Sequence, residues 1–332
     1  MAVVLIMLLG AAAIAAELIA HYVLELGDPV LMQTHPTIEY LAQPNQDARV
    51  YGTRHLINHV GMRSDQLPAD PATWRLLVLG DSVINGGRLT DHDALATTLA
   101  QTALGDALDQ PVWVGNASAG SWGPGNWLAY VEEFGTFRAD AALIVLSPHD
   151  IADVPTFDPA NAEQLTTETP WTAAGVALGE VWARVAPQVL RSERQTENPN
   201  DLSQPGIAIP RANHPARRAS ERSLTALLKR FADERIPAAV LYFPEADSDA
   251  RHAEPRQRLR NISQQASASF IDLSDTFLTD APFTNPAYRD RMHPSAFGQR
   301  LLAEALTEAA LRLLDSNRPR DQSMGVPAAT EP

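Results

Sequence analysis

Five short apolar runs constrain the fold of this chain more than any other feature of its sequence. They begin at Trp74, Pro111, Ala141, Ala238 and Ser269, and each soon gives way to polar or turn residues. The runs are nearly continuous in apolar residues, which is typical of strands buried on both faces rather than of half-exposed strands. We therefore expect five strands in a mainly parallel sheet.

Segments with helical spacing separate these runs. Leu95, Leu99 and Leu104 fall near one helix face, and residues 127–134 and 224–231 also repeat apolar side chains at helical intervals. The segment 296–314 also keeps one face apolar, and a further helix is expected around residues 176–190. Strands that alternate with helices predict an α/β domain whose parallel sheet is covered on both sides.

The N-terminal segment, residues 1–26, is the second strong signal. Its first part is almost wholly apolar, Glu17 and His21 interrupt it later, and the first arginine is Arg49. Three interpretations stay open: a transmembrane anchor, a signal peptide cleaved near the small residues Ala13 to Ala16, or a buried helix of a soluble protein. Either of the first two places the rest of the chain outside the cytoplasm, in the periplasm or beyond.

Charge and cysteine content exclude several classes of function. The formal net charge is -14, which disfavours binding to nucleic acid or to an anionic surface because both are themselves negative. There is no cysteine, which removes disulfides, thiolate zinc sites and cysteine nucleophiles.

The rest of the chain divides by composition. Residues 27–70 are predicted to form a connecting region, and residues 71–315 the α/β domain. A long insertion, residues 153–216, interrupts that domain, and loops of this length are usually functional or disordered. The polar tail, residues 316–332, is predicted to be disordered.

Candidate chemical groups stand where strands end. The sequences GDS, GNASAGSWG and SPHD follow three strands, and DRMHPS precedes the last helix. Ligands of open parallel sheets bind at the carboxyl ends of the strands, so these groups are expected to converge. A serine becomes a nucleophile when histidine takes its proton and a carboxylate orients that histidine. Ser82, His293 and Asp290 can fill these roles in acyl transfer.

Simpler interpretations exist for each of these residues. Ser82 can be an ordinary turn residue, Asp290 an ion-pair partner in a loop, and His293 a packed or solvated histidine. Ser295 is a natural N-cap for the last helix. Taken together and in this order, the residues favour the catalytic interpretation.

These residues resemble the blocks of the SGNH or GDSL hydrolases, of the membrane-anchored bacterial type. VLGDS is similar to the first block, with Ser82 as nucleophile, and Asp290 to His293 is similar to the Asp-x-x-His block that completes the triad. NASAGSWG resembles the second block, in which a glycine N–H joins the oxyanion hole. Gly120 is the best match, with Gly123 as the alternative. The resemblance implies a flavodoxin-like three-layer α/β/α sandwich.

One upstream motif and one departure complete the comparison with the family. NHVGMR, residues 58–63, looks like the Asn-x-x-Gly-x-Arg that precedes the domain in anchored members. The family usually has Gly-x-Asn-Asp after the third strand, but here the stretch is SPHD, so His149 replaces the oxyanion asparagine. A neutral imidazole can still donate one N–H to the oxyanion. The alternative is a structural histidine paired with Asp150.

The sequence therefore predicts an exported or membrane-anchored serine esterase or acylhydrolase. Ser82, Asp290 and His293 form the expected triad, and the N–H groups of Ser82 and Gly120 with the His149 side chain form the expected oxyanion hole. The expected partner is an ester of a small molecule, lipid or carbohydrate. No cofactor is implied, and a metal site at His149, Asp150 and Asp153 lacks a second histidine at ligand spacing. The alternatives are an O-acyltransferase acting on an exported polysaccharide and a non-catalytic binding protein that keeps the fold.

Overall fold

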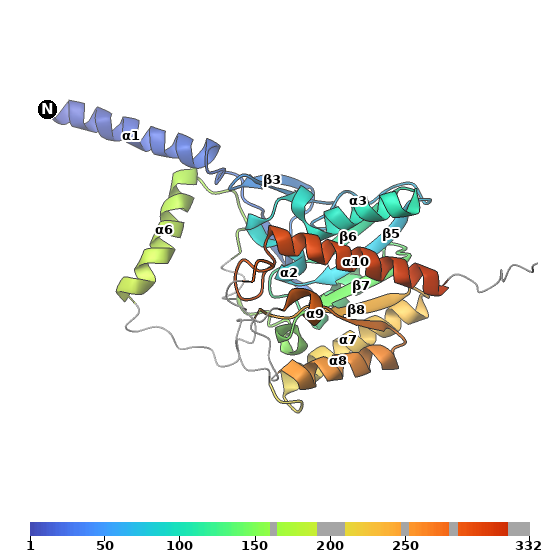
Figure 1. The fold of residues 1–332 in the computed structure, drawn as a ribbon. Coiled ribbons are helices and arrows are strands. Elements are labelled where there is room, and N and C mark those ends of the chain that lie inside the picture. The colour runs from blue at the N-terminus through green and yellow to red at the C-terminus, as the bar shows by residue number, and fades with distance from the viewer. Residues whose placement is uncertain (160–164, 191–209, 247–251, 279–284, 318–332) are drawn as a thin grey trace, which may run out of the picture.

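A five-stranded, wholly parallel sheet forms the centre of the molecule (Figure 1). The computed structural model describes residues 1–159, 165–190, 210–246, 252–278 and 285–317. The strands are β5 (Trp74–Gly80), β6 (Val112–Ser118), β7 (Ala141–Leu146), β8 (Ala238–Tyr242) and β9 (Ser269–Asp272), in the order β6-β5-β7-β8-β9. This is the flavodoxin-like order 2-1-3-4-5, so the fold expected from the sequence is confirmed.

Helices cover both faces of this sheet. One face packs against α3 (Ala96–Leu108) and α10 (Ala296–Asn317), and the other against α4 (Pro124–Phe134), α7 (Pro215–Asp233) and α8 (Ala253–Gln265). Four of these helices fall where apolar spacing predicts them; α8 was not predicted. The shorter helices are α2 (Ser82–Asn85) and α9 (Ser274–Phe277), with 3₁₀ turns at Gly87–Leu89, His92–Ala94 and His149–Ala152.

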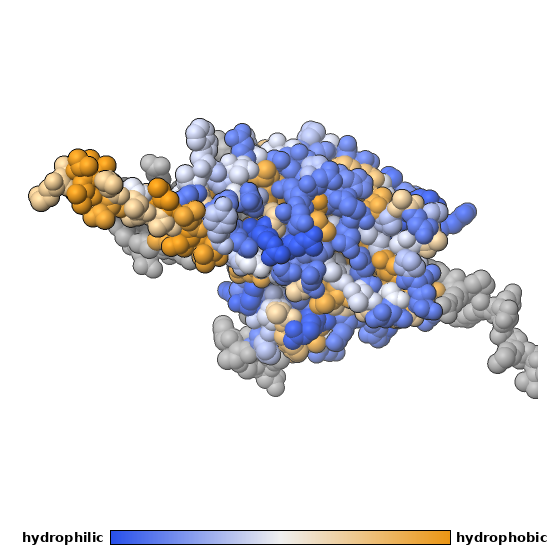
Figure 2. All heavy atoms as spheres, turned by 90° about the horizontal axis from the view of Figure 1, so that it is seen from above, coloured by the Kyte–Doolittle hydropathy of each residue, from blue (hydrophilic) through white to orange (hydrophobic). Residues whose placement is uncertain are grey.

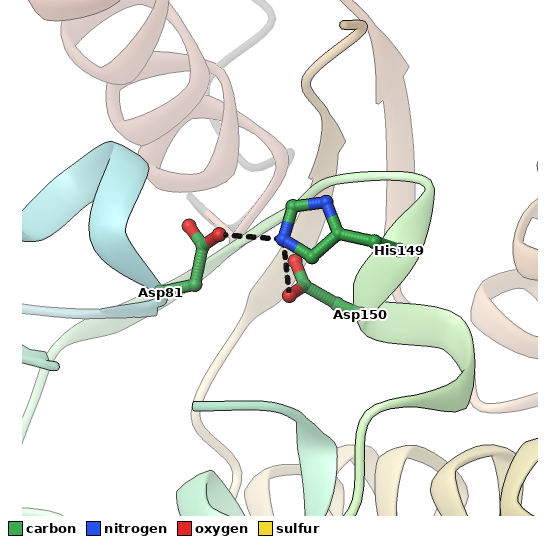
Figure 3. Close-up of side chains that lie close together, drawn as sticks. All are labelled: Asp81, His149 and Asp150. Carbon is green, nitrogen blue, oxygen red and sulfur yellow. Dashed lines mark hydrogen bonds and ion pairs between the residues drawn. The ribbon is translucent and has the colours of Figure 1, made fainter. Parts of the chain in front are cut away.

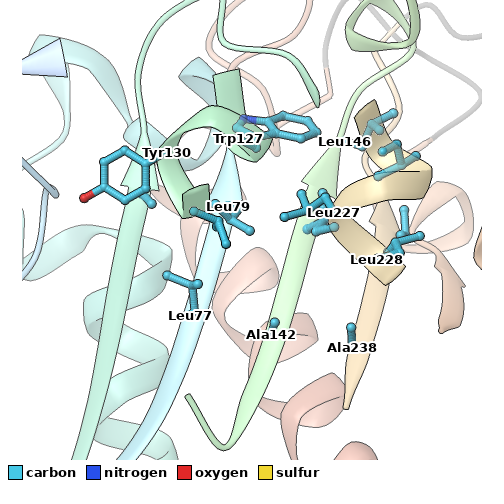
Figure 4. Packing of buried hydrophobic residues seen from close by; sticks show 14 of the residues in the cluster. Leu77, Leu79, Trp127, Tyr130, Ala142, Leu146, Leu227, Leu228 and Ala238 are labelled. Carbon is cyan, nitrogen blue, oxygen red and sulfur yellow. The ribbon is translucent and has the colours of Figure 1, made fainter. Parts of the chain in front are cut away.

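The core lies in two layers because alternate residues of each strand face opposite ways. Leu77 and Leu79 pack with Trp127 and Leu227 on the α4 and α7 side (Figure 4). Leu76, by contrast, belongs to the cluster that includes the α3 and α10 side chains. Truncating such a fully buried leucine to alanine typically costs about 2–5 kcal/mol, so the sheet is a rigid support for whatever its strand ends carry.

Residues 27–70, expected as a connecting region, contain two antiparallel hairpins. The first pairs β1 (Met32–His35) with β2 (Glu39–Ala42), and the second pairs β3 (Gln46–Val50) with β4 (Thr53–Ile57). These strands have only four or five residues and are largely polar, so no period-2 pattern is long enough to reveal them in the sequence.

Helix α1 (Ala2–Tyr22) projects from this body (Figures 1 and 2). Its mean hydropathy is 2.5, and its 21 residues are long and apolar enough to cross a membrane. Near its C-terminal end begins α6 (Ala173–Leu190), close to the helix predicted within the insertion. The rest of the insertion is described only in part, and the predicted disordered tail from residue 318 lies outside the described residues.

Candidate active site

The first element of the site is a sharp turn between β5 and α2. Asp81 follows the last strand residue, and its Oδ1 accepts a hydrogen bond of 2.9 Å from the backbone N–H of Val83. An aspartate in this position is a favourable N-cap, so α2 begins at Ser82. The indole N–H of Trp127 donates to the carbonyl of Gly80 at 2.9 Å and fixes the strand end. Ser82 is half-buried at the carboxyl edge of the sheet.

The second element is the loop before α10. The Oδ1 atom of Asp290 accepts hydrogen bonds from the backbone N–H groups of Met292, at 2.9 Å, and His293, at 2.8 Å. Nδ1 of His293 lies 2.8 Å from Asp290 Oδ2, and Nε2 lies 3.0 Å from Ser82 Oγ. The structure thus brings Ser82, His293 and Asp290 into one hydrogen-bonded chain. With the ring proton on Nδ1, facing the carboxylate, Nε2 accepts the serine hydroxyl.

Electrostatics favour an ionised Asp290. Partial burial opposes its ionisation, but the backbone N–H groups and the His293 ring outweigh burial and hold the pKa of Asp290 below its usual value. Ser295 caps α10, as the sequence suggests, because its Oγ accepts from the N–H groups of Phe297 and Gly298 at 3.2 Å. The loop that carries His293 is therefore anchored from both sides.

The two glycines considered for the oxyanion hole have different surroundings. Strands β5 and β6 pair Gly80 with Ser118, so Gly120 follows its strand end just as Ser82 follows β5. The N–H of Gly123 instead donates to the Asn126 side chain at 3.0 Å. A Cβ at Gly123 would lie 2.6 Å from the carbonyl oxygen of Asp153, so this glycine allows close packing. The geometry favours Gly120 as the donor.

His149 lies among three carboxylates, two of which, Asp81 and Asp150, are drawn in Figure 3. Its Nε2 is 3.1 Å from Asp81 Oδ2 and 3.3 Å from Asp150 Oδ1, and its Nδ1 is 3.4 Å from Glu245 Oε1. These groups follow β5, β7 and β8, so three neighbouring strand ends converge on one imidazole. Because both ring nitrogens face carboxylates, neither is directed at an incoming carbonyl oxygen. The oxyanion role of His149 stays a prediction, and the geometry favours the structural alternative.

The charges of this cluster are unusual. Burial opposes protonation of His149, but the facing carboxylates of Asp150, Asp81 and Glu245 outweigh it and hold the pKa of the imidazole well above its usual value. Burial and the charge of Asp81 raise the pKa of the Asp150 carboxyl well above its usual range. A positive charge on the imidazole ring offsets the negative charge of the surrounding carboxylates, which are costly to ionise in a buried site without a positive partner.

The same cluster is where a cation could bind. Asp81, His149 and Asp150 each offer one ligand atom, and these atoms lie within 4.8 Å of one another. One oxygen of Asp81 and one of Asp150 are already engaged by backbone N–H groups, from Val83 and Ser147. The candidate ligands named from the sequence were His149, Asp150 and Asp153, whereas in the structure Asp81 joins His149 and Asp150.

The motif NHVGMR supports the nucleophile turn. Arg63 is buried, and its guanidinium donates to the carbonyls of Asn85, at the end of α2, and of Gly87 and Thr90, which follow it. Burial lowers the pKa of Arg63 to about 10, so the group is still cationic near neutral pH. Gly61 has φ +77°, and a Cβ there would lie 2.8 Å from the Ala42 carbonyl oxygen, which explains the glycine of the motif.

A cavity of about 400 Å³ lies beside the nucleophile turn. Asn85 and Gly120 form part of its wall, and the remaining wall is mostly apolar. Much of that apolar wall comes from the segment before the sheet, including Val30, Met32 and Ile57. This contribution could not be predicted from the sequence, because residues 27–70 show no clear periodicity.

Comparison with known proteins gives one family. Residues 208–308 match the family model described as "SGNH domain (fused to AT3 domains)". The resemblance to SGNH hydrolases is confirmed. The matched residues include Asp290 and His293 but not Ser82. No curated protein matches the chain.

Several solved structures are similar to this chain at low identity. A mutant of Axe2, an acetyl-xylooligosaccharide esterase from Geobacillus, is 15% identical, with a TM-score of 0.43 over 75% of this chain and 97% of that chain. TesA is 15% identical, with a TM-score of 0.45 over 72% of this chain and 99% of that chain. The esterase EstA from Pseudoalteromonas sp. is 16% identical, with a TM-score of 0.42 over 73% of this chain and 98% of that chain.

Proposed function

We propose that the protein is a serine hydrolase that cleaves an ester through a covalent acyl-enzyme. The observation that carries this proposal is the hydrogen-bonded chain from Ser82 Oγ through His293 to Asp290. A serine hydroxyl at 3.0 Å from an imidazole nitrogen is within reach of a general base.

The reaction follows from these positions. Ser82 Oγ attacks the ester carbonyl carbon while His293 Nε2 takes its proton. The tetrahedral intermediate then collapses, and His293 returns the proton to the leaving alcohol. In the second half, His293 takes a proton from water, which attacks the acyl-enzyme carbonyl carbon. The second tetrahedral intermediate collapses, the bond to Ser82 Oγ breaks, and His293 returns the proton to Ser82 Oγ as the acid leaves. Asp290 holds the ring orientation and stabilises the imidazolium in both halves.

The oxyanion is stabilised by backbone donors in this proposal. The N–H groups of Ser82 and Gly120 stand at the ends of adjacent strands and can point at one developing negative charge. His149 contributes indirectly, because it holds Asp81, which caps the helix that carries Ser82.

The cavity beside the turn suggests the acyl part of the substrate. Its walls are mostly apolar and its volume is about 400 Å³, which suits an acyl chain longer than acetyl. Each methylene buried there contributes about 0.8 kcal/mol, or about fourfold in affinity. We expect kcat/KM for nitrophenyl esters to rise from acetate to hexanoate, and equal values would contradict this assignment of the cavity.

Acyl transfer is the second candidate, because the matching family model is described as fused to AT3 domains. The two reactions share the acyl-enzyme and differ in whether water or a sugar hydroxyl accepts the acyl group. Mass spectrometry of the products, with a polysaccharide fragment added as acceptor, separates them. An acylated sugar supports transfer, and release of free acid alone supports hydrolysis.

We also propose that α1 anchors an exported catalytic domain. Its length and mean hydropathy support a membrane span. Fractionation should recover the full-length protein in the membrane pellet, whereas a shortened soluble form would indicate a cleaved signal peptide.

The direct kinetic test compares wild type with Ser82→Ala and His293→Ala on a short nitrophenyl ester. Both variants should lose activity by about 10³-fold or more, because loss of either group disables the triad. A folded Ser82→Ala variant with wild-type kcat/KM would overturn the proposal.

A further inference from the structure

Helix α6 exposes a strongly apolar outer face. Leu178 is 70% exposed, Trp182 is 65% exposed, and Trp171, just before the helix, is fully exposed. Val181 is also exposed beside them. Positions 178, 181 and 182 lie close to one face of α6 at helical spacing. Large apolar side chains gathered in this way usually mark a surface that is covered by something other than water.

The polar side of the same helix faces the body of the protein. Glu180 pairs with Arg88 at 2.5 Å and accepts a hydrogen bond from the Tyr51 hydroxyl. Ala173 and Val176 pack on the same inner side, in the cluster that includes Val50. A surface helix in water normally turns its carboxylates outward and its apolar residues inward. Over residues 173–182, α6 directs its carboxylate inward and its largest apolar side chains outward.

Helix α1 fixes where α6 begins. The Glu17 carboxylate accepts hydrogen bonds from the backbone N–H groups of Ala173, at 2.8 Å, and Ala174, at 3.0 Å. These are first-turn N–H groups of α6, which have no partner within their own helix. The single carboxylate in α1, unexpected in so apolar a helix, is thus the cap of α6.

The two helices run in very different directions. In Figure 1, α6 starts beside the C-terminal end of α1 and runs crosswise to it. A helix that crosses a bilayer lies roughly along the membrane normal. A second helix that starts at its end and runs crosswise then lies along the membrane surface. Tryptophan favours this interfacial depth, which agrees with Trp171 and Trp182 on the outer face.

We propose that α6 is an interfacial helix whose outer face, formed by Trp171, Leu178, Val181 and Trp182, inserts into the lipid surface. The inference rests on the proposed anchoring by α1. We infer that the bilayer covers this outer face, because α6 begins beside α1, a helix with the length and hydropathy of a membrane span. Because both α1 and the outer face of α6 contact the membrane, the α/β domain is held in a fixed orientation at the membrane surface.

Fluorescence quenching by brominated lipid tests this placement in the full-length protein. The chain has six tryptophans, and the four outside this region are buried. Nanodiscs that contain phosphatidylcholine brominated near the headgroup end of the acyl chains should quench part of the wild-type emission. A Trp171→Phe, Trp182→Phe double variant keeps an apolar face and should show less than a third of that quenching.

A matched control places a tryptophan elsewhere. Arg312 is exposed near the end of α10, which lies far from α6 in Figure 1. Arg312→Trp in the double-variant background should add emission that brominated lipid does not quench. Equal quenching of wild type and double variant in intact nanodiscs would overturn the proposal while leaving the anchor in place. Failure of the full-length chain to associate with nanodiscs would overturn both.

A second variant separates lipid from a second copy of the chain. Leu178→Asp adds a charge to the outer face and should reduce quenching at least twofold without changing the oligomeric state. If the wild type is instead a dimer in detergent that Leu178→Asp dissociates, and shows no quenching, the face binds another copy and the proposal is wrong.

Discussion

The Oδ2 atom of Asp81 lies 3.1 Å from Nε2 of His149, while the other oxygen of that carboxylate caps the helix that begins at Ser82. A buried imidazole and the nucleophile turn are therefore linked through one side chain. This relationship gives His149 a positioning role that the family resemblance did not suggest.

Replacing His149 by asparagine separates the two interpretations of this residue. The oxyanion hypothesis from the sequence predicts retained or increased esterase activity, because an amide restores the usual donor. The cluster geometry predicts a less stable protein with lower kcat, because three buried carboxylates lose their cation. Chemical denaturation and kcat measurements on His149→Asn distinguish the two interpretations. His59→Asn is the control, because the His59 side chain is exposed.

The pH dependence of stability gives a further test of the same cluster. The pKa of His149 is higher in the folded protein than the ordinary value of 6.5, because the facing carboxylates outweigh its burial. Its protonation therefore stabilises the fold fully below about pH 6.5, and this contribution is lost as pH rises through the folded value. The stability advantage of wild type over His149→Asn should shrink as pH rises above about 6.5. An advantage that grows over this range would contradict the assigned charge.

Gly120 can be tested by removing only its N–H. Trp122 N–H bonds to the Ala119 carbonyl and Ser121 has φ +55°, so Gly120 is the second residue of a turn in which proline is well tolerated. Gly120→Pro should lower kcat by about 10²–10³-fold, because an oxyanion donor is lost. Gly120→Ala is the control, since a Cβ there meets nothing within 4 Å. Similar kcat values for both variants would mean that the oxyanion donor is not the N–H of Gly120.

Asp290→Asn tests the orientation of His293. The amide keeps the shape of the carboxylate but can donate a hydrogen bond to Nδ1 of His293. This favours the tautomer with the ring proton on Nε2, which cannot accept the Ser82 proton. We expect kcat to fall by about 10⁴-fold, as in comparable changes of a triad aspartate. The exposed Asp275→Asn is the matched control. A loss below about tenfold would mean that Asp290 only caps the loop through its backbone contacts.

Arg63→Lys tests the support beneath the nucleophile turn. Lysine cannot reach the three carbonyls that the guanidinium satisfies, so the free energy of unfolding should fall by about 3 kcal/mol. Arg54→Lys is the control, because the Arg54–Asp47 pair is partly exposed and contributes about 0–1 kcal/mol. Equal losses in the two variants would contradict the role assigned to Arg63.

The strands were predictable because each contains a short apolar run, as at Leu76 to Leu79. Helix α8 was not, because its few buried residues, such as Leu259 and Ile262, lie among charged and polar ones. The triad residues could be named from their motifs, but their proximity depends on long-range folding. The partners of His149 could not be predicted, because Asp81 and Glu245 meet it only when separate strand ends converge.

The most direct test of the central assignment is covalent labelling of the intact protein with a fluorophosphonate, followed by mass spectrometry of the labelled peptide. Ser82 Oγ should carry the adduct, and both Ser82→Ala and His293→Ala should label at background level. A folded wild type that takes no label, or an adduct that persists on another residue in Ser82→Ala, would contradict the account.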